Sequence, residues 1–181
     1  MRVIGVDPGS AVTGYGVVDG DGRTFRRVDS GTIRTRPRDP GPLRLRTIYE
    51  RLTAVLDEHA PGAVSLERSF VAENVQSAFR LGEARAMVLL AAAQRDLALF
   101  EYNPTDVKLT VAAYGRADKA QVKFMVRQTL ALDETIELAD DAADALALAL
   151  CHLTMARIPA ALGAFNGRRA PRWRNAGRRT P

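Results

Sequence analysis

Residues 2–18, RVIGVDPGSAVTGYGVV, decide the fold of this chain. The stretch begins with an apolar run that ends in a carboxylate, Asp7, and its second half is rich in β-forming side chains with interspersed glycines. The sequence DGDG at 19–22 favours a tight turn, so a strand over about 24–34 is expected to complete a hairpin. Glycines cost strand stability, so Gly14 and Gly16 indicate tight turns or a close approach of another backbone.

The rest of the chain alternates helices with short buried strands. A helix fits residues 43–58, because apolar side chains recur there at helical spacing. Residues 63–67 (AVSLE) predict a buried strand that again ends in a carboxylate, Glu67. The remaining expected elements are a strand over 97–101 and helices over 74–95, 104–112, 118–131 and 139–157. The order βββαβαβααα predicts an α/β fold, a mixed sheet flanked by helices.

Two of these helices begin with a recognisable cap signal. Asn103 before Pro104 is typical of an N-cap followed by proline at the first helical position. Asp118 with Gln121 three residues later resembles a capping box.

Length and composition exclude several classes of protein. The 181 residues fit one domain, and 46% hydrophobic with 26% charged residues is ordinary globular usage. The single cysteine, Cys151, excludes an internal disulfide and a multi-cysteine zinc module. No apolar run reaches the roughly 18 residues of a membrane-spanning helix, and MRVIGVDPGS lacks the apolar segment of a signal peptide. We expect a cytoplasmic protein with no membrane partner.

The net charge of +5 comes from the end of the chain. Residues 166–181 hold six arginines and no acid, which leaves 20 basic and 21 acidic residues in the rest. We therefore expect a folded domain over 1–160 and a basic, disordered tail over 161–181. Bulk charge alone is then no evidence for nucleic-acid binding.

Four carboxylates are candidates for a metal site. Asp7 and Glu67 each end a buried strand, and parallel strands can place them side by side at one sheet edge. Asp141 and Asp144 are three residues apart on a predicted helix, so they share a face that can cover this edge. Carboxylates in a small space repel one another without a cation, and magnesium takes oxygen ligands. Two such ions about 4 Å apart can activate water and stabilise the leaving oxygen of a phosphodiester.

Simpler interpretations of these residues stay open. An aspartate at a strand end is commonly a turn former, and an acidic pair is commonly a solvated helix face. Spacing also allows Asp140 with Asp144, an i,i+4 pair on a similar face. Lys119, Lys123 and Arg127 recur every four residues, and this basic stripe is either solvated or in contact with phosphates.

Four blocks of the sequence together resemble the RuvC Holliday-junction resolvases. They are VIGVDPGSAVTGYGVV, LERSFVAENVQSAFRLGEARA, FEYNPTDVKLTVAAYGRADKAQV and DDAADALALAL, in this order, within about residues 2–155. The resemblance implies a ribonuclease-H-like fold with a five-stranded mixed sheet and helices on both faces. It also implies a homodimeric, magnesium-dependent endonuclease that resolves four-way DNA junctions by paired symmetric nicks in recombination and repair.

The resemblance also assigns roles to individual residues. Its catalytic and metal-binding positions fall on Asp7, Glu67, Asp141 and Asp144, which selects Asp141 over Asp140. Two magnesium ions per subunit are implied, with manganese as a substitute. Its DNA contacts fall on Phe70, which would stack on junction bases, and on Lys108 and Lys119, with Lys123 and Arg127 on the same basic stripe.

The implied partners are a second copy of the chain and a branch-migration complex, made of a junction-binding protein and a ring ATPase. The apolar stretch 86–93 is the expected dimer contact. The chain has no G-x-x-x-x-G-K motif, so it is not expected to drive branch migration itself, and the ATPase is a partner that the resemblance implies.

Three other functions fit parts of the pattern. A ribosomal-RNA-processing nuclease of the same fold and a non-catalytic junction-binding protein remain alternatives. An ATP-binding phosphotransferase of the actin and sugar-kinase type opens with a similar strand, aspartate and glycines, but 181 residues leave no room for its second lobe.

Overall fold

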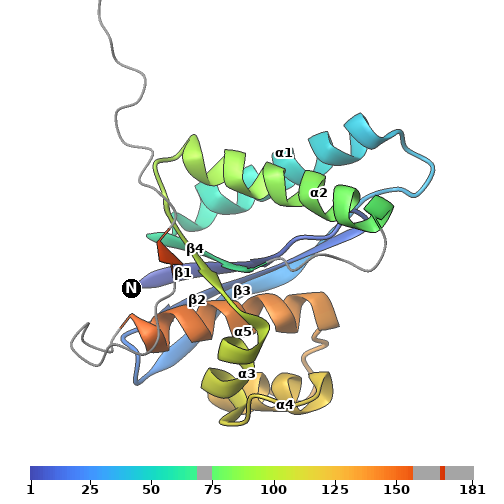
Figure 1. Cartoon of the computed structure of the whole chain (residues 1–181). Coiled ribbons are helices and arrows are strands. Elements are labelled where there is room, and N and C mark those ends of the chain that lie inside the picture. Colours follow the sequence, from blue (N-terminus) through green and yellow to red (C-terminus); the bar gives the residue numbers. More distant parts are fainter. Residues whose placement is uncertain (69–74, 157–167, 170–181) are drawn as a thin grey trace, which may run out of the picture.

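A mixed six-stranded sheet forms the centre of the molecule (Figure 1). The computed structural model describes residues 1–68, 75–156 and 168–169. The strands lie in the order β3-β2-β1-β4-β5-β6. Their bounds are β1 Arg2–Asp7, β2 Val12–Gly20, β3 Phe25–Arg34, β4 Ala63–Glu67, β5 Ala98–Tyr102 and β6 Arg168–Arg169. The central strands β1, β4 and β5 are parallel, whereas β2, β3 and β6 pair antiparallel with their neighbours.

Helices cover both faces of the sheet. Helices α1 (Gly41–His59) and α2 (Val75–Ala93) lie on one face, and α5 (Asp140–Met155) lies on the other, against β1 and β2. Helices α3 (Pro104–Ala112) and α4 (Lys119–Thr129) pack against α5 below the sheet in Figure 1. Within the described ranges, no helix is both long and apolar enough to span a membrane. The expected layers, a mixed sheet with helices on both sides, are confirmed.

The predicted elements are found with ends within two residues of expectation, and one strand is additional. The sequence places 161–181 in a disordered tail, yet Arg168 and Arg169 pair with Glu101 and Phe100 of β5. The five expected strands are confirmed, and the two-residue β6 is added at one edge of the sheet. A two-residue strand carries no periodic signal, and the unpaired edge of β5 provides its hydrogen-bonding partner. The rest of the tail lies outside the described residues, and the domain division at 160 stays a prediction.

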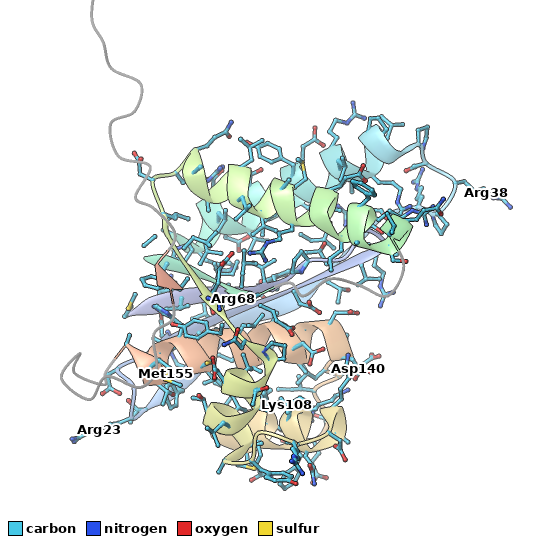
Figure 2. The ribbon with its side chains drawn as sticks, viewed as in Figure 1. Arg23, Arg38, Arg68, Lys108, Asp140 and Met155 are labelled. Atoms are coloured by element: carbon cyan, nitrogen blue, oxygen red, sulfur yellow. The ribbon has the colours of Figure 1, made fainter. Side chains whose placement is uncertain are left out.

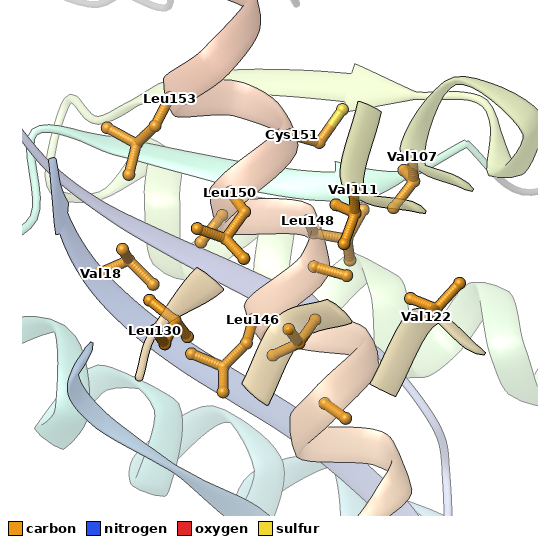
Figure 3. Packing of buried hydrophobic residues seen from close by; sticks show 14 of the residues in the cluster. Val18, Val107, Val111, Val122, Leu130, Leu146, Leu148, Leu150, Cys151 and Leu153 are labelled. Atoms are coloured by element: carbon orange, nitrogen blue, oxygen red, sulfur yellow. The ribbon is translucent and has the colours of Figure 1, made fainter. Parts of the chain in front are cut away.

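Side chains alternate along the central strands between two separate hydrophobic clusters. Val3 belongs to the cluster formed with α3, α4 and α5 (Figure 3), whereas Val6 and Leu66 belong to the cluster formed with α1 and α2. The next residues along these two strands, Asp7 and Glu67, therefore face the α5 side of the sheet. The alternation of side chains that forms the two hydrophobic clusters thus also directs both carboxylates toward α5.

Helix α5 lies directly on the sheet because glycines face it. A Cβ added at Gly5 would lie 1.9 Å from the carbonyl oxygen of Ala145, and one at Gly14 would lie 1.9 Å from that of Asp141. The close backbone approach that the glycines of β2 predict is thereby confirmed. It brings the acidic first turn of α5 down to the end of β1.

Candidate active site

Two of the predicted carboxylates meet at the carboxyl ends of β1 and β4. The parallel register pairs Val6 with Leu66, so Asp7 and Glu67 follow side by side on neighbouring strands. Neighbouring strands lie about 4.8 Å apart, a distance at which two carboxylates on the same face repel each other.

Helix α5 brings the second pair of carboxylates to the same place. Burial, followed by the charges of Asp144, Glu67 and Asp141, raises the pKa of Asp7 to about 7. Asp144 lines the same pocket as Asp7 and Glu67, whereas Asp141 acts on Asp7 without being part of the lining. The four carboxylates that the sequence singles out therefore lie near one another, close enough for the other three to raise the pKa of Asp7.

The neighbouring Asp140 faces a different group. Its side chain is 77% exposed and accepts a hydrogen bond from Lys123 Nζ at 2.7 Å. This bond lowers the pKa of Asp140. Figure 2 shows Asp140 at the start of α5. The geometry thus favours Asp141 with Asp144 over the Asp140 pair that spacing left open.

The pocket combines acidic and basic groups. It has a volume of about 350 Å³, and its lining includes Asp7, Glu67, Asp144, Lys108 and Lys119. Burial and the charge of Asp144 raise the pKa of Glu67, while Lys119 and Lys108 act in the opposite direction. Two lysines from α3 and α4 therefore partly balance the carboxylates of the sheet and α5.

Lys119 supplies positive charge directly to the acidic group. Its Nζ donates a hydrogen bond to the Asp144 carboxylate at 3.3 Å, and the charge of Asp144 raises the pKa of Lys119.

Among the described residues, no group of three or more Asp, Glu, His or Cys side chains is close enough together to hold a metal ion. Asp7, Glu67 and Asp144 line the pocket without converging on one point.

The cap of α4 places Lys119 at the first position of the helix. The Asp118 side chain accepts a hydrogen bond from the Gln121 N–H at 2.8 Å, and the Gln121 side chain accepts one from the Asp118 N–H at 3.0 Å. The predicted capping box is confirmed. Asn103 precedes α3 as expected, but its side chain makes no cap and instead accepts a hydrogen bond from Arg68 at 3.2 Å.

The other predicted DNA contacts differ in what the structure shows of them. Lys123 is bonded to the start of α5, as described above. Arg127 donates hydrogen bonds to the carbonyl oxygens of Ile136 at 3.0 Å and Asp133 at 2.7 Å, so its guanidinium already binds the loop before α5. Phe70 lies outside the described residues. The DNA-binding roles of these three side chains stay predictions.

Sequence reasoning missed one residue beside the site, Arg85 on α2. Its Nη1 donates a hydrogen bond to the backbone carbonyl of Glu67 at 2.8 Å. Nothing in the local sequence marks this contact, because it depends on how α2 packs over the end of β4.

A mixed sheet with acidic residues at the ends of two central strands, faced by the acidic start of a helix, defines a ribonuclease-H-like nuclease. The yeast mitochondrial Holliday junction resolvase shares this fold, with a TM-score of 0.61 and 16% identity over 84% of this chain and 79% of that one. The family model described as crossover junction endodeoxyribonuclease RuvC matches residues 3–152. The chain belongs to the RuvC family.

Individual relatives cover most of the chain. The crossover junction endodeoxyribonuclease RuvC of Alkalilimnicola ehrlichii is 47% identical over 161 residues, which is 89% of this chain and 96% of that protein. The structure of Thermus thermophilus RuvC in complex with a Holliday junction substrate has a TM-score of 0.81 and 36% identity, over 87% of this chain and 95% of that one. The resemblance found in the sequence is confirmed, and the ribosomal-RNA nuclease and the non-catalytic binder are set aside.

Proposed function

We propose that this crossover junction endodeoxyribonuclease resolves four-way DNA junctions by paired symmetric nicks, using divalent metal ions held by Asp7, Glu67, Asp141 and Asp144. The observation that carries the proposal is the pocket in which Asp7, Glu67 and Asp144 face two lysines. The substrate class follows from the family and from the Thermus relative, which was solved with a Holliday junction substrate.

The donor set fits a hard divalent cation. The four side chains offer only oxygen ligands, and magnesium combines a few carboxylates with water and substrate phosphate, so a closed protein cage is unnecessary. Burial and three neighbouring carboxylates oppose the charge of Asp7, and a cation would relieve this repulsion. We assign two magnesium ions per subunit, with manganese as a substitute. When bound, the ions would activate the attacking water and stabilise the leaving oxygen.

The lysines of the pocket are suited to hold the DNA backbone. Lys108 projects from α3 (Figure 2) and lines the pocket together with Lys119 from α4. Each phosphate that a lysine neutralises contributes about −0.9 to the slope of log binding constant against log salt concentration. Lys108→Gln should therefore flatten this slope by about one for junction binding. An unchanged slope would remove Lys108 from the DNA contacts.

Paired nicks require two active sites, so we propose a homodimer with two-fold symmetry. Helix α2 supports this because one stripe along its solvent side is apolar. Val75 and Phe79 are each 70% exposed and Leu90 is 44% exposed, with exposed Gly82 and Ala86 between them. These five residues, which we call the α2 stripe, recur every three or four positions, a spacing that suits helix-to-helix packing.

The α2 stripe only partly overlaps the stretch 86–93 expected from the sequence. Val88, Ala91 and Ala92 within that stretch are buried in the core of the subunit itself. The proposed contact is therefore centred closer to the start of α2.

A branch-migration complex is the second proposed partner, since the resemblance to the family implies one and the sequence carries no G-x-x-x-x-G-K motif with which to drive branch migration itself. Adding a ring ATPase and its junction-binding protein should raise the rate of paired nicking on a mobile junction. An unchanged rate on both mobile and immobile junctions would contradict this partner.

The decisive experiment is a nicking assay on a mobile four-way DNA junction labelled on opposite strands, with magnesium or EDTA. The wild type should make paired nicks only with magnesium, and Asp7→Asn and Glu67→Gln should each lose at least about 100-fold in rate. Asp140→Asn is the matched control, because this neighbouring acid on α5 faces Lys123, and it should stay within about threefold of the wild type. Nicking in EDTA, or by Asp7→Asn at the wild-type rate, would contradict the proposal.

A further inference from the structure

Arg85 connects helix α2 with the ends of two strands. Its Nη1 donates to the carbonyl oxygen of Glu67 at 2.8 Å, and its Nη2 forms a salt bridge with the carboxylate of Glu101 on β5. The side chain is only 14% exposed. The guanidinium group is planar and its donors have fixed directions, so it holds the two acceptors in a defined arrangement.

The carbonyl that Arg85 binds lies where the strand pairing of β4 stops. Pairing with β1 ends at Val6 and Leu66, one residue before Glu67. On the other side, the Arg68 N–H donates to the carbonyl of Tyr102, so β5 holds the chain just after Glu67. A backbone carbonyl away from water needs a donor, and Arg85 provides one for Glu67.

Glu101 is placed to anchor this arginine. Side chains alternate along β5, and Leu99, two residues earlier, belongs to the cluster formed with α1 and α2. Glu101 therefore faces α2 and meets Arg85 there. The ion pair neutralises the largely buried guanidinium and leaves Nη1 directed at Glu67.

We propose that Arg85 is a positioning residue for the active site, which holds the end of β4 so that the Glu67 carboxylate faces Asp7 and Asp144. The inference rests on the proposed function of Glu67 as a metal-binding carboxylate. Arg85 itself is on the α2 side of the sheet and bonds to backbone and Glu101, so it acts on Glu67 and not on DNA.

Three variants test this role. Arg85→Met removes both contacts, Arg85→Lys keeps the charge but not the planar pair of donors, and Glu101→Gln weakens the anchor while Arg85 stays in place. Each should lower kcat for junction nicking, by about 10- to 100-fold for Arg85→Met, with KM for the junction within about twofold. Each should also reduce the rise in thermal midpoint that magnesium produces in the absence of DNA.

Arg95→Met is the matched control. Arg95 follows α2 and binds the Asp57 carboxylate through Nε and Nη2, both at 2.7 Å, and the Ala91 carbonyl at 3.4 Å. It therefore makes the same kinds of contact, but with α1 and α2 only. Arg95→Met should lower the thermal midpoint while kcat and the magnesium-induced rise stay unchanged.

The outcomes separate this inference from the proposed function. If Arg85→Met and Arg85→Lys behave like Arg95→Met, losing stability alone, the positioning role is wrong. If Glu67→Gln nicks junctions at the wild-type rate, the proposed function of the site fails, whatever the Arg85 variants do. An inactive Glu67→Gln with fully active Arg85 variants overturns only the positioning role.

Discussion

Asp7 lies where burial and three other carboxylates oppose its charge. Together they raise its pKa to about 7, from about 4 in an unfolded chain. Between these two pH values the folded protein keeps a proton on Asp7 that the unfolded chain has released. The contribution of Asp7 to the free energy of unfolding therefore falls as pH rises from about 4 to 7, and this loss is the cost of an acidic site without a cation.

Asp7→Asn should remove this loss, because asparagine has a similar shape and does not ionise. Above pH 7 the variant should be more stable than the wild type by up to about 4 kcal/mol, since each pKa unit corresponds to about 1.4 kcal/mol. The difference should shrink toward zero near pH 4. Urea unfolding across this pH range, with EDTA, measures it. Saturating magnesium should narrow the gap by stabilising only the wild type.

The quantity to compare is the difference in free energy of unfolding between Asp7→Asn and the wild type, because other groups also change the stability of both proteins with pH. Burial lowers the pKa of His152 to about 4, so the unfolded chain binds a proton there before the folded protein does. The folded protein therefore loses stability at His152 as pH falls from about 6.5 to 4, which is opposite to the effect of Asp7. Asp140→Asn is the control, because Lys123 lowers the pKa of Asp140, and removing this carboxylate should bring no gain at high pH. A difference between Asp7→Asn and wild type that does not change with pH would contradict the account of Asp7.

At the scale of elements, the contact of α5 with β1 and β2 assembles the site. Glycines allow the helix backbone to touch the strands, while leucines and valines on either side fill the cluster in Figure 3. The start of α5, which carries Asp141 in its first turn and Asp144 in the next, is held where Gly14 faces the Asp141 carbonyl. The contacts that pack α5 against the sheet therefore also place its carboxylates at the end of β1.

Gly14→Ala adds only one methyl group but should lower the nicking rate strongly. The new Cβ would lie 1.9 Å from the Asp141 carbonyl oxygen, so the first turn of α5 must move. We expect a loss of about 1–3 kcal/mol in stability, as for overpacked cores, and a fall of about 100-fold in nicking rate. Chemical unfolding and the junction assay measure the two effects.

Gly41→Ala is the control for this substitution. No atom lies within 4 Å of a Cβ added at Gly41, which begins α1. This variant should keep full activity and equal or slightly higher stability. Full activity of Gly14→Ala would show that the position of α5 over β1 tolerates displacement, contrary to our expectation.

At the scale of the whole molecule, the proposed active site and the α2 stripe lie on different sides of the sheet. The pocket is on the α5 side, and α2 covers the opposite face (Figure 1). A dimer formed through α2 would therefore leave both pockets open to the arms of one junction. Two-fold symmetry in the protein then matches the symmetry of the proposed nicks.

Phe79→Glu should produce a folded monomer, because it places a charge at an exposed apolar position of the α2 stripe. Its mass by light scattering should be half that of the wild type, and paired nicks should be replaced by single, unpaired ones. Phe124→Glu is the matched control, since Phe124 is 58% exposed on α4, and it should remain dimeric. A dimeric Phe79→Glu would place the subunit contact elsewhere.

Most of the secondary structure could be predicted because its signals are local. Periods of two and 3.6 residues, the DGDG turn and the Asp118 capping box each lie within one short window. Asn103 did not act as a side-chain cap, because Arg68, directly after the neighbouring strand β4, donates a hydrogen bond to its side-chain oxygen. Strand β6 could not be predicted either, because its two residues depend on the edge of β5.

The sequence by itself determined the family, the order of the elements and the four candidate carboxylates, since acidic strand ends and the D-x-x-D spacing can be read directly. Tertiary structure decided which carboxylates act together. The orientation of α5 on the sheet turns Asp140 toward Lys123 and brings Asp141 and Asp144 close to Asp7. It also directed Arg85 to Glu67 and raised the pKa of Asp7. Burial and charge repulsion depend on distances between residues far apart in the chain, and only packing sets those distances.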